Sequence, residues 1–384
     1  WRSGAEEERC RAPARAGSPH LVHVFPSFGV GGVQIRFATL VGALGDRFRH
    51  TVVSLNNDFA AADFVPRDAE VAFAEPPPRA GSPARRLREL HAFIASQHAD
   101  LLLTHNWGSM EAVIANAFGP TPHIHLEDGF GPEEAHQQLA RRVWTRRIAL
   151  ARSQVVVPSR ALQVIATTTW GLDPRRVQHI PNGLAPCGGR PAPLADLGLN
   201  LLAASPRIVW AGALRSEKNP LRLLRAFACL KARALLLLIG DGPERAAVET
   251  EAARLGLGSS VRFLGHRTDS RSIIAQCDLL ALSSDTEQMP LVVLEAMDAG
   301  LPVVATDVGD IREMLAEENR PYVVPPDVAE FGAALAALVD SPALRTRIGA
   351  ANRARQRALY GLGPMVEAYR GTFDRALASA RRPA

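Results

Sequence analysis

Short apolar runs rich in β-branched residues alternate along the first half of the chain with longer amphipathic stretches. The apolar runs have the length of strands, and the amphipathic stretches repeat their apolar positions with the period of a helix. Such alternation is typical of a parallel sheet with helices on both faces. The expected strands are 21–26, 51–55, 100–105, 122–127, 154–159 and 177–182, and the expected helices are 32–45, 84–98, 108–118, 133–152 and 159–170.

A segment rich in glycine, proline and alanine interrupts this pattern near the middle of the chain. The alternation then resumes, which predicts a second doubly wound domain and a ligand cleft at the carboxyl ends of both sheets. The expected strands of this half are 207–212, 235–240, 261–265, 279–284, 302–306 and 322–326, followed by helices at 328–339, 342–357 and 362–381. The expected division is a disordered leader at 1–19, an N-terminal acceptor-side Rossmann-like domain at 20–185, a linker at 186–205, a C-terminal Rossmann-like domain at 206–360, and a final helix at 361–384 that packs back on the N-terminal domain.

Composition narrows the class of protein. Four scattered cysteines indicate neither a disulfide framework nor a zinc site, and they fit a reducing cytoplasm. The longest apolar run is strand-sized, well short of the ~18–20 residues that cross a bilayer. The net charge is +5, and Lys218 and Lys231 are the only lysines among 44 basic residues. Because no aromatic residues are interleaved with the basic ones, a nucleic-acid surface is not indicated.

The stretch Thr286–Met297, TEQMPLVVLEAM, places two glutamates eight positions apart around an apolar run. It follows an expected strand, and Pro290 suits a first helical residue because its φ is fixed and its missing N–H is not needed there. The free amides of that first turn, including those of Leu291 and Val292, favour an anion such as a diphosphate. We therefore expect a helix whose N-terminus faces a ligand.

The second glutamate, Glu295, lies inside this expected helix among apolar neighbours, where an unpaired carboxylate is costly. A pair of ribose hydroxyls would satisfy it, and each hydrogen bond to a charged group contributes roughly 1.5–3 kcal/mol. Glu287, nearer the helix start, is placed to reach hydroxyls of a sugar attached to the diphosphate. The alternative is that Glu295 forms an ion pair with a neighbouring arginine and that Glu287 is simply solvated.

The longer stretch around this motif, SSDTEQMPLVVLEAMDAGLPVVATDVGDIREML, closely resembles the E-x7-E region of family-four retaining glycosyltransferases. That family has the GT-B fold of two Rossmann-like domains, and the resemblance covers most of the chain. It implies that Glu295 binds the nucleotide ribose and that Glu287 contacts the donor sugar, with Met289 and Pro290 in the donor loop. Gln288 stands where the family often has glycine, which could alter this loop.

A second match, VWAGALRSEKNPLRLLRAF at 209–227, is similar to the family's strand, glycine, basic loop and helix. The resemblance implies that Lys218 and Arg215 hold the donor diphosphate. Lys218 matches the family's lysine directly, whereas Ala213 stands where an arginine is often found, two residues before Arg215. A retained lysine in an arginine-rich chain favours a need for a compact point charge. Taken alone, this pattern fits two surface charges after a strand as well as it fits a diphosphate site at Lys218 and Arg215.

Two shorter matches follow in the same half. The turn IGDGPER at 239–245 resembles the family's Gly-Asp-Gly-Pro turn, where glycines allow a sharp change of direction from strand to helix. The stretch VRFLGHRTD at 261–269 resembles the loop that cups the nucleobase, which makes His266 and Arg267 base-side candidates.

The N-terminal half carries the candidates for the acceptor side. A glycine-rich turn at a helix start is an anion cradle, and Gly31 and Gly32 in FPSFGVGGVQIRFATL match a family loop that approaches donor phosphate and acceptor. In PHIHLEDGFGPEEAH at 122–136, Asp128 stands where many family members have a histidine near the reacting centre. Glu127 and His125 are further candidates. The alternative is a polar cluster that orders a loop.

Two other features have structural or surface roles. The turn IPNGL matches the family's Pro-Asn-Gly, so a hinge is expected at Asn182 and Gly183. The expected helix with RRVWTRRIALAR is a candidate for contact with the inner face of an anionic membrane, and the alternative is a solvated basic face. Its basic and aromatic residues are Arg141, Arg142, Trp144, Arg146, Arg147 and Arg152.

The favoured hypothesis is a cytoplasmic, retaining, hexosyltransferase-type glycosyltransferase that uses a nucleotide-diphosphate sugar. Because no Asp-x-Asp loop is evident, we expect no metal, and cations and the helix dipole would stabilise the leaving diphosphate. Asp128 would orient or deprotonate the acceptor hydroxyl of a glycan, lipid-linked or small-molecule acceptor. The resemblance implies a role in cell-surface or exopolysaccharide synthesis. The alternatives are an NDP-sugar 2-epimerase and a non-catalytic carbohydrate-binding derivative of the fold.

Overall fold

The computed structural model describes residues 17–117, 119, 121–134, 137–187, 205–230, 233–258 and 260–380. Contacts between residues divide the chain into two units. Unit 1 is Trp1–Gly129, Leu139–Ile180 and Met365–Ala384, and unit 2 is Phe130–Gln138 and Pro181–Pro364. Most of the expected leader and linker therefore lies outside the described residues.

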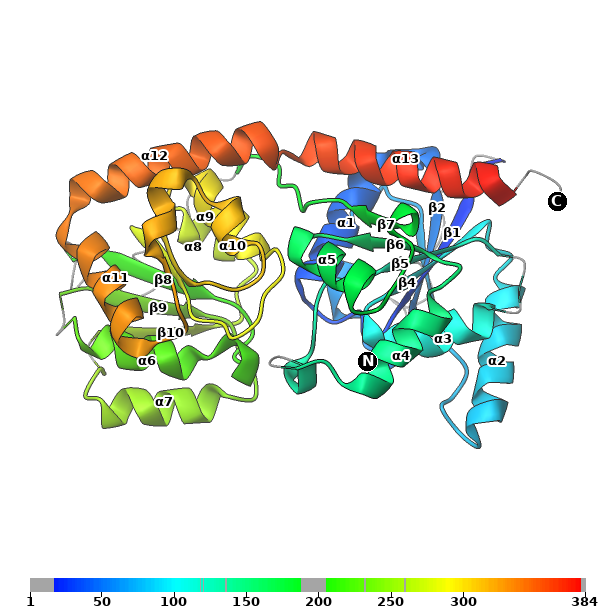
Figure 1. The fold of residues 1–384 in the computed structure, drawn as a ribbon, viewed down its shortest axis with the longest axis horizontal. Coiled ribbons are helices and arrows are strands. Elements are labelled where there is room, and N and C mark those ends of the chain that lie inside the picture. Colours follow the sequence, from blue (N-terminus) through cyan, green and yellow to red (C-terminus); the bar gives the residue numbers. More distant parts are fainter. Residues whose placement is uncertain are drawn as a thin grey trace, which may run out of the picture. The chain divides into compact units, whose positions relative to one another are not determined.

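Unit 1 contains a parallel sheet with the strand order β3-β2-β1-β4-β5-β6-β7 (Figure 1). Each expected strand of this half is present, and β3 is an addition. It was missed because it is a four-residue edge strand that is only partly buried, so it lacks a long apolar run. The strands are β1 His20–Phe25, β2 Arg49–Ser54, β3 Val71–Ala74, β4 Leu101–His105, β5 His123–Leu126, β6 Gln154–Val157 and β7 Val177–His179.

The helices of unit 1 follow the amphipathic stretches with one correction. The expected helix at 133–152 is shorter, because Leu139 is extended (φ −71°, ψ 122°) and only a short 3-10 turn, Pro132–Glu134, precedes it. The helices are α1 Gly32–Leu44, α2 Pro83–Ser96, α3 Met110–Asn116, α4 Ala140–Ala149, α5 Arg160–Thr168 and most of α13 Leu362–Ala380.

Helices cover both faces of this sheet. Val22 and Val24 of β1 pack with Ile94 of α2 on one face, whereas Phe25 packs with Phe37 of α1 on the other. The last helix, red in Figure 1, belongs to unit 1 from Met365 onward and contributes buried residues to it. In this unit the ring of Phe373 lies 5.9 Å from that of Phe48, and Asp374 is 2.8 Å from Arg47.

Three buried histidines stand beside one another on the β1, β2 and β4 strands of unit 1. His23 Nε2 lies 3.0 Å from His50 Nδ1, and His23 Nδ1 lies 3.4 Å from His105 Nε2. Burial lowers the pKa of all three, that of His50 to about 3, because a charged imidazole would be desolvated and close to other charges. They are therefore neutral in the folded protein at neutral pH.

The free energy of unfolding is expected to fall as the pH drops from 6.5 toward 3. The reason is that these histidines bind protons in the unfolded chain but stay neutral in the folded protein. At pH 5 each such histidine accounts for ~2 kcal/mol of this loss. Urea unfolding at pH 7.5 and pH 5 should show a smaller loss in His50→Asn than in the wild type. His98→Asn, at an exposed histidine, is the matched control and should change the loss little. An equal pH dependence in both variants would contradict the assignment.

Unit 2 contains a second parallel sheet with the order β10-β9-β8-β11-β12-β13. All of its strands were expected. They are β8 Arg207–Ala211, β9 Leu235–Ile239, β10 Val261–Gly265, β11 Leu279–Leu282, β12 Val303–Thr306 and β13 Val323–Val324. The helices are α6 Pro220–Ala228, α7 Arg245–Arg254, α8 Ser270–Ile274, α9 Leu291–Ala299, α10 Ile311–Met314, α11 Val328–Asp340 and α12 Pro342–Leu359.

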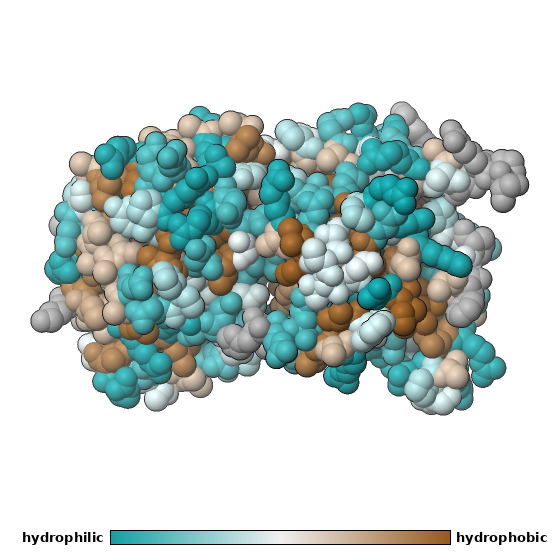
Figure 2. Space-filling model, in the orientation of Figure 1, coloured by the Kyte–Doolittle hydropathy of each residue, from teal (hydrophilic) through white to brown (hydrophobic). Residues whose placement is uncertain are grey.

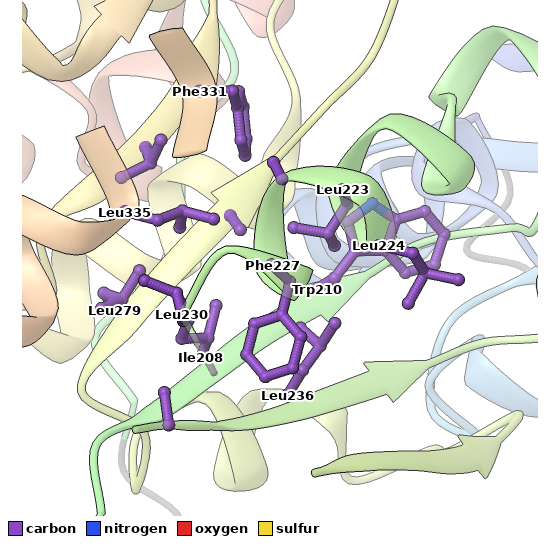
Figure 3. Close-up of a cluster of buried hydrophobic side chains, with 14 of the residues drawn as sticks. Ile208, Trp210, Leu223, Leu224, Phe227, Leu230, Leu236, Leu279, Phe331 and Leu335 are labelled. Carbon is purple, nitrogen blue, oxygen red and sulfur yellow. The ribbon is translucent and has the colours of Figure 1, made fainter. Parts of the chain in front are cut away.

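The unit 2 sheet is buried on both faces, which explains its nearly continuous apolar strands. Trp210 of β8 faces a cluster with Phe227 of α6 and Phe331 of α11 (Figure 3). Its neighbour Val209 points the other way and packs with Val293 of α9. The same alternation in β9 divides its five apolar residues between the two clusters.

The surface visible in Figure 2 is mostly hydrophilic, with apolar side chains in small groups. Among the described residues, no helix is both long enough and apolar enough to span a bilayer.

Candidate functional site

In unit 2 the strand order reverses between β8 and β11, which lie side by side. In open α/β sheets, ligands bind beyond the carboxyl ends of strands at such a point. The loop after β8 carries Arg215 and Lys218, and the loop after β11 carries Glu287. The topology therefore brings together two regions that are about seventy residues apart in the chain.

The central contact of this site joins Lys218 to Glu287. The Lys218 ammonium donates to Glu287 Oε1 at 2.7 Å, and the Ser284 hydroxyl donates to the same oxygen at 2.8 Å. The Lys218 side chain is 27% exposed and that of Glu287 is 8% exposed. The other carboxylate oxygen of Glu287 has no hydrogen bond within the described part of the chain. A cation and a carboxylate are thus held together where the family resemblance places diphosphate and sugar.

A second set of contacts ties the two loops together behind this pair. Asn219 caps α6 by accepting from the Arg222 amide at 3.0 Å, and its side-chain amide donates to Asp285 at 3.0 Å. Arg222 donates to Asp285 at 2.6 Å and to the carbonyl of Ser283 at 2.7 Å. Asn219 adopts a left-handed conformation (φ 44°), which asparagine tolerates. Lys218, directly before it, is therefore held by a fixed turn.

Helix α9 begins at this site. Pro290 is the residue before the helix and not its first residue, a shift of one position from expectation. The amides of Leu291 and Val292 have no hydrogen-bond partner among the described residues, so they are available to an anion. The preceding Met289 packs its side chain in the core, and its carbonyl accepts from the Asn182 side-chain amide at 2.8 Å. Asn182, expected as a hinge, thus braces the loop before α9.

Glu295 lies in the second turn of α9 without a hydrogen bond or ion pair among the described residues. Burial raises its pKa to about 7, and Arg271 opposes that rise only in part. Arg271 is itself paired with Asp298 at 2.7 Å. The expected alternative, a Glu295–arginine ion pair, is therefore not found in the described part of the chain. A nearly buried carboxylate that lacks a partner is the kind of group that a pair of ligand hydroxyls would satisfy.

The remaining donor-side candidates are less closely held. The Arg215 side chain is 61% exposed, and its guanidinium is 4.0 Å from Glu217 Oε1. Arg267 follows β10, at the edge of the sheet, and forms an ion pair with Asp269 at 2.7 Å. His266 beside it is exposed. The first glycine of the IGDGPER turn, Gly240 (φ 132°), lies so close to the Gly212 carbonyl that a Cβ would collide with it.

In unit 1 the order reverses between β1 and β4, and the glycine turn follows β1. Gly31 is the residue before α1 and Gly32 is the first residue of that helix. The chain after β4 begins with Asn106, which has a positive φ of 57°. Asp128 follows the neighbouring β5, and its amide donates to Asn106 Oδ1 at 2.7 Å. The expected acceptor-side loops therefore meet at the carboxyl ends of the central strands β1, β4 and β5.

Asp128 and its two neighbours have different surroundings. Asp128 forms a two-pronged ion pair with Arg36 of α1, one contact being 2.8 Å. His125 and Glu127 are completely buried. His125 Nδ1 is 2.7 Å from Thr104 Oγ1, and Glu127 is 3.4 Å from the buried Arg146. Fully buried side chains cannot touch an acceptor in this conformation, so these two support the loop from behind.

Several site residues were not anticipated from the sequence. Ser284 could have been found, because it lies three positions before Glu287 in the matched motif. Arg36 and Asn106 carried no signal, because each is distant in sequence from Asp128. Arg146 was expected on a basic surface but is buried between the rings of Trp107 and Trp170, each about 4.9 Å away.

Two family models match the chain in succession. Residues 30–186 match the model described as Glycosyltransferase Family 4, and residues 205–341 match the model described as Glycosyl transferases group 1. Between them they cover most of both units.

Individual relatives are also glycosyltransferases, and a solved structure has a similar fold. The chain is 31% identical over 191 residues to the lipopolysaccharide core biosynthesis glycosyltransferase LpsD of Rhizobium meliloti, a match that spans 49% of this chain and 55% of that protein. It is 28% identical to a D-inositol 3-phosphate glycosyltransferase of Kineococcus radiotolerans over 74% of this chain and 73% of that one. The crystal structure of Anabaena HepE with UDP-glucose has a TM-score of 0.81 at 20% identity, covering 92% of this chain and 99% of HepE.

Proposed function

Since the chain belongs to the GT-B glycosyltransferases of the family 4 and group 1 type, we propose that it transfers a hexosyl group from a nucleotide-diphosphate sugar to an acceptor hydroxyl with retention at the anomeric carbon. The acceptor is a glycan, a lipid-linked sugar or a small molecule in cell-surface or exopolysaccharide synthesis. The observation that carries this proposal is the Lys218–Glu287 pair at the switch point, in the loop that leads to the α9 amides left without a partner among the described residues.

Each group at this site has a role in the proposed reaction. Lys218 and the amides of Leu291 and Val292 stabilise the negative charge that grows on the departing diphosphate. Glu295 accepts hydrogen bonds from the ribose. When the diphosphate engages Lys218, Glu287 becomes available to hydroxyls of the donor sugar. The bond from the anomeric carbon to the diphosphate oxygen breaks, the bond to the acceptor oxygen forms, and the hydroxyl proton passes to the departing diphosphate.

Nucleoside diphosphates are expected to stabilise the protein, since ligand at a hundred times its Kd adds ~2.7 kcal/mol to the free energy of unfolding. UDP and UDP-glucose are the first probes, because the HepE crystal structures hold them, and GDP and ADP complete the panel. Thermal shift identifies the donor, and incubation with saccharide acceptors then tests transfer, which we expect to persist in EDTA. Interconversion of the donor sugar without acceptor would indicate an epimerase, and binding without transfer a non-catalytic protein. No response to any nucleotide would contradict the proposal.

The exposed stripe of α4 supports a second element of the proposal, contact with an anionic membrane. Trp144 is 60% exposed and Ile148 is 73% exposed. Arg141, Arg147 and Arg152 are exposed on the same stretch, and the Arg147 guanidinium lies 5.4 Å from the Trp144 ring. Aromatic and aliphatic side chains surrounded by arginines suit the interface of a bilayer, where each basic residue contributes about 1 kcal/mol.

The double variant Trp144→Ala/Ile148→Ala is expected to lose most of its binding to vesicles that contain phosphatidylglycerol, because it lacks the apolar anchor. Co-sedimentation with these vesicles and with pure phosphatidylcholine vesicles measures the effect. Val164→Ala is the matched control, since Val164 is an exposed apolar residue of α5, 58% exposed. Wild-type-like sedimentation of the double variant would exclude this stripe as the contact.

A further inference from the structure

Both carboxylate oxygens of Asp128 are engaged by one buried guanidinium. Arg36 donates to Oδ1 and Oδ2 of Asp128, and the side chains are 4% and 11% exposed respectively. A planar fork of this kind fixes the plane and the direction of the carboxylate, which a single hydrogen bond would not. The backbone of Asp128 is fixed as well, by its amide bond to Asn106.

Arg36 and Asn106, which bind Asp128, are fixed by contacts of their own. The Arg36 guanidinium lies 5.9 Å from the centre of the buried Tyr369 ring of α13. Asn106 adopts φ 57° and ψ 172°, a backbone conformation that costs energy and that is found mostly where a site requires it. Its amide donates to the Leu126 carbonyl at 2.8 Å, and its own carbonyl accepts from Ser109. Helix α1, the chain after β4 and α13 therefore meet around the Arg36–Asp128 pair.

This arrangement separates two roles that the sequence left open for Asp128. A proton transferred to the carboxylate would remove the charge that the buried Arg36 guanidinium binds on both oxygens, which is unfavourable. Each carboxylate oxygen nevertheless keeps a second lone pair, which can accept a hydrogen bond. The geometry thus favours orientation of a hydroxyl over removal of its proton.

We propose that Arg36 is a positioning residue of the transfer reaction, which fixes Asp128 as an oriented carboxylate that accepts a hydrogen bond from the acceptor hydroxyl without taking its proton. This inference rests on the proposed function. The acceptor proton passes to the diphosphate oxygen as the donor bond breaks, so that no protein base is required. Arg36 does not touch the acceptor and acts only through Asp128.

Among the described residues, Tyr369 of α13 and His105 of β4 are titratable groups that interact with this pair. Burial raises the pKa of Tyr369 to about 12, and burial beside Arg36 lowers the pKa of His105 well below its usual range. Neither group titrates between pH 6 and 9. Because the charge of Arg36 helps to lower the pKa of His105, the double variant Arg36→Met/Asp128→Asn is the control that separates His105 from Asp128.

The test measures kcat, acceptor KM and donor Kd for Arg36→Met, Arg36→Lys, Asp128→Asn and the double variant Arg36→Met/Asp128→Asn. Arg36→Met should raise acceptor KM about tenfold or more with donor Kd unchanged, and it should gain an acid limb in the pH profile of kcat/KM. The double variant, which carries no titrating carboxyl, should lose that limb. Arg36→Lys, which keeps the charge without the fork, should lie between Arg36→Met and the wild type.

Asp128→Asn distinguishes the two roles of the carboxylate. Because its amide oxygen still accepts a hydrogen bond, we expect a loss in kcat of no more than about tenfold, whereas loss of a general base costs about 10²–10⁴-fold. A loss of that larger size in both Asp128→Asn and the double variant would overturn the proposal. Wild-type transfer with unchanged acceptor kinetics and pH profile in Arg36→Met would overturn the positioning role alone. Failure of the wild type to bind any nucleotide would overturn the proposed function instead.

Discussion

Lys218→Ala is expected to lower the rate of sugar transfer by about 10²–10³-fold, the usual effect of removing one group that stabilises charge in a transition state. The loss has a direct structural reason. Lys218 is the cation that reaches Glu287 at the switch point of unit 2, and its ammonium is the part of the side chain that a diphosphate would meet. The exposed Arg215 is the other basic residue of this loop, but it is 4.0 Å from its nearest carboxylate oxygen and less firmly placed.

Steady-state kinetics and donor binding by calorimetry measure this effect, and circular dichroism checks the fold. The free energy of unfolding should fall by about 1–3 kcal/mol, because the Glu287 carboxylate that loses its cation is nearly buried. Arg233→Ala is the control, since Arg233 also forms an ion pair on unit 2, with Asp340, and it precedes β9 at the amino end of that strand. Lys218→Arg should retain part of the activity, because it keeps the charge but not the compact ammonium. Turnover equal to that of the wild type in Lys218→Ala would remove this residue from the site.

Glu295→Gln is expected to stabilise the protein at pH 8 and to weaken donor binding at the same time. The carboxylate has a pKa of about 7 in the folded protein because it is desolvated, whereas its ordinary value is 4.5. The ionised form therefore costs ~3 kcal/mol at pH 8, and a neutral glutamine avoids that cost. If the ribose hydroxyls donate to the charged carboxylate, the variant loses these charge-assisted hydrogen bonds, and donor binding weakens about tenfold to hundredfold.

The stabilisation by Glu295→Gln is expected to depend on pH. A raised folded pKa means that the group favours the folded state fully below pH 4.5 and that this contribution is lost as the pH rises toward 7. The stability difference between Glu295→Gln and the wild type should therefore be largest at pH 8 and should disappear near pH 4.5. Urea unfolding across this range measures it, with Glu249→Gln, an exposed glutamate of α7, as the control. A variant that is less stable than the wild type at pH 8 would contradict the unpaired state of Glu295.

Local patterns were sufficient to predict most of the secondary structure. The apolar runs gave each strand of unit 2, because buried parallel strands are apolar on both faces. The strand β3 was not predicted, because a short, partly exposed edge strand has no such run. The start of α4 was predicted too early, because nothing in the local pattern marks Leu139 as extended. The candidate donor residues were found through two motif matches, the stretch at 209–227 with Lys218 and the E-x7-E stretch with Glu287 and Glu295.

Partnerships between charged residues depended on the tertiary structure. Five arginines in the helical stretch at 141–152 look alike in sequence, yet Arg146 is enclosed by two tryptophan rings while Arg147 is exposed. Likewise, Arg36 and Asp128 are 92 positions apart, and only the strand order of unit 1 brings them together. Within the described residues Glu295 has no ion pair, which only the tertiary structure shows, because the nearby Arg271 is paired with Asp298.

The amino-acid sequence by itself determined the two doubly wound halves, the family and the candidate residues of a donor site, because periodicity and motif spacing are properties of neighbouring positions. The tertiary structure alone decided which charges are paired, which are buried and which are left for a ligand. The physical reason is that the energy of a charge depends on its solvation and on its partners, and both are set by elements that meet only in the folded chain.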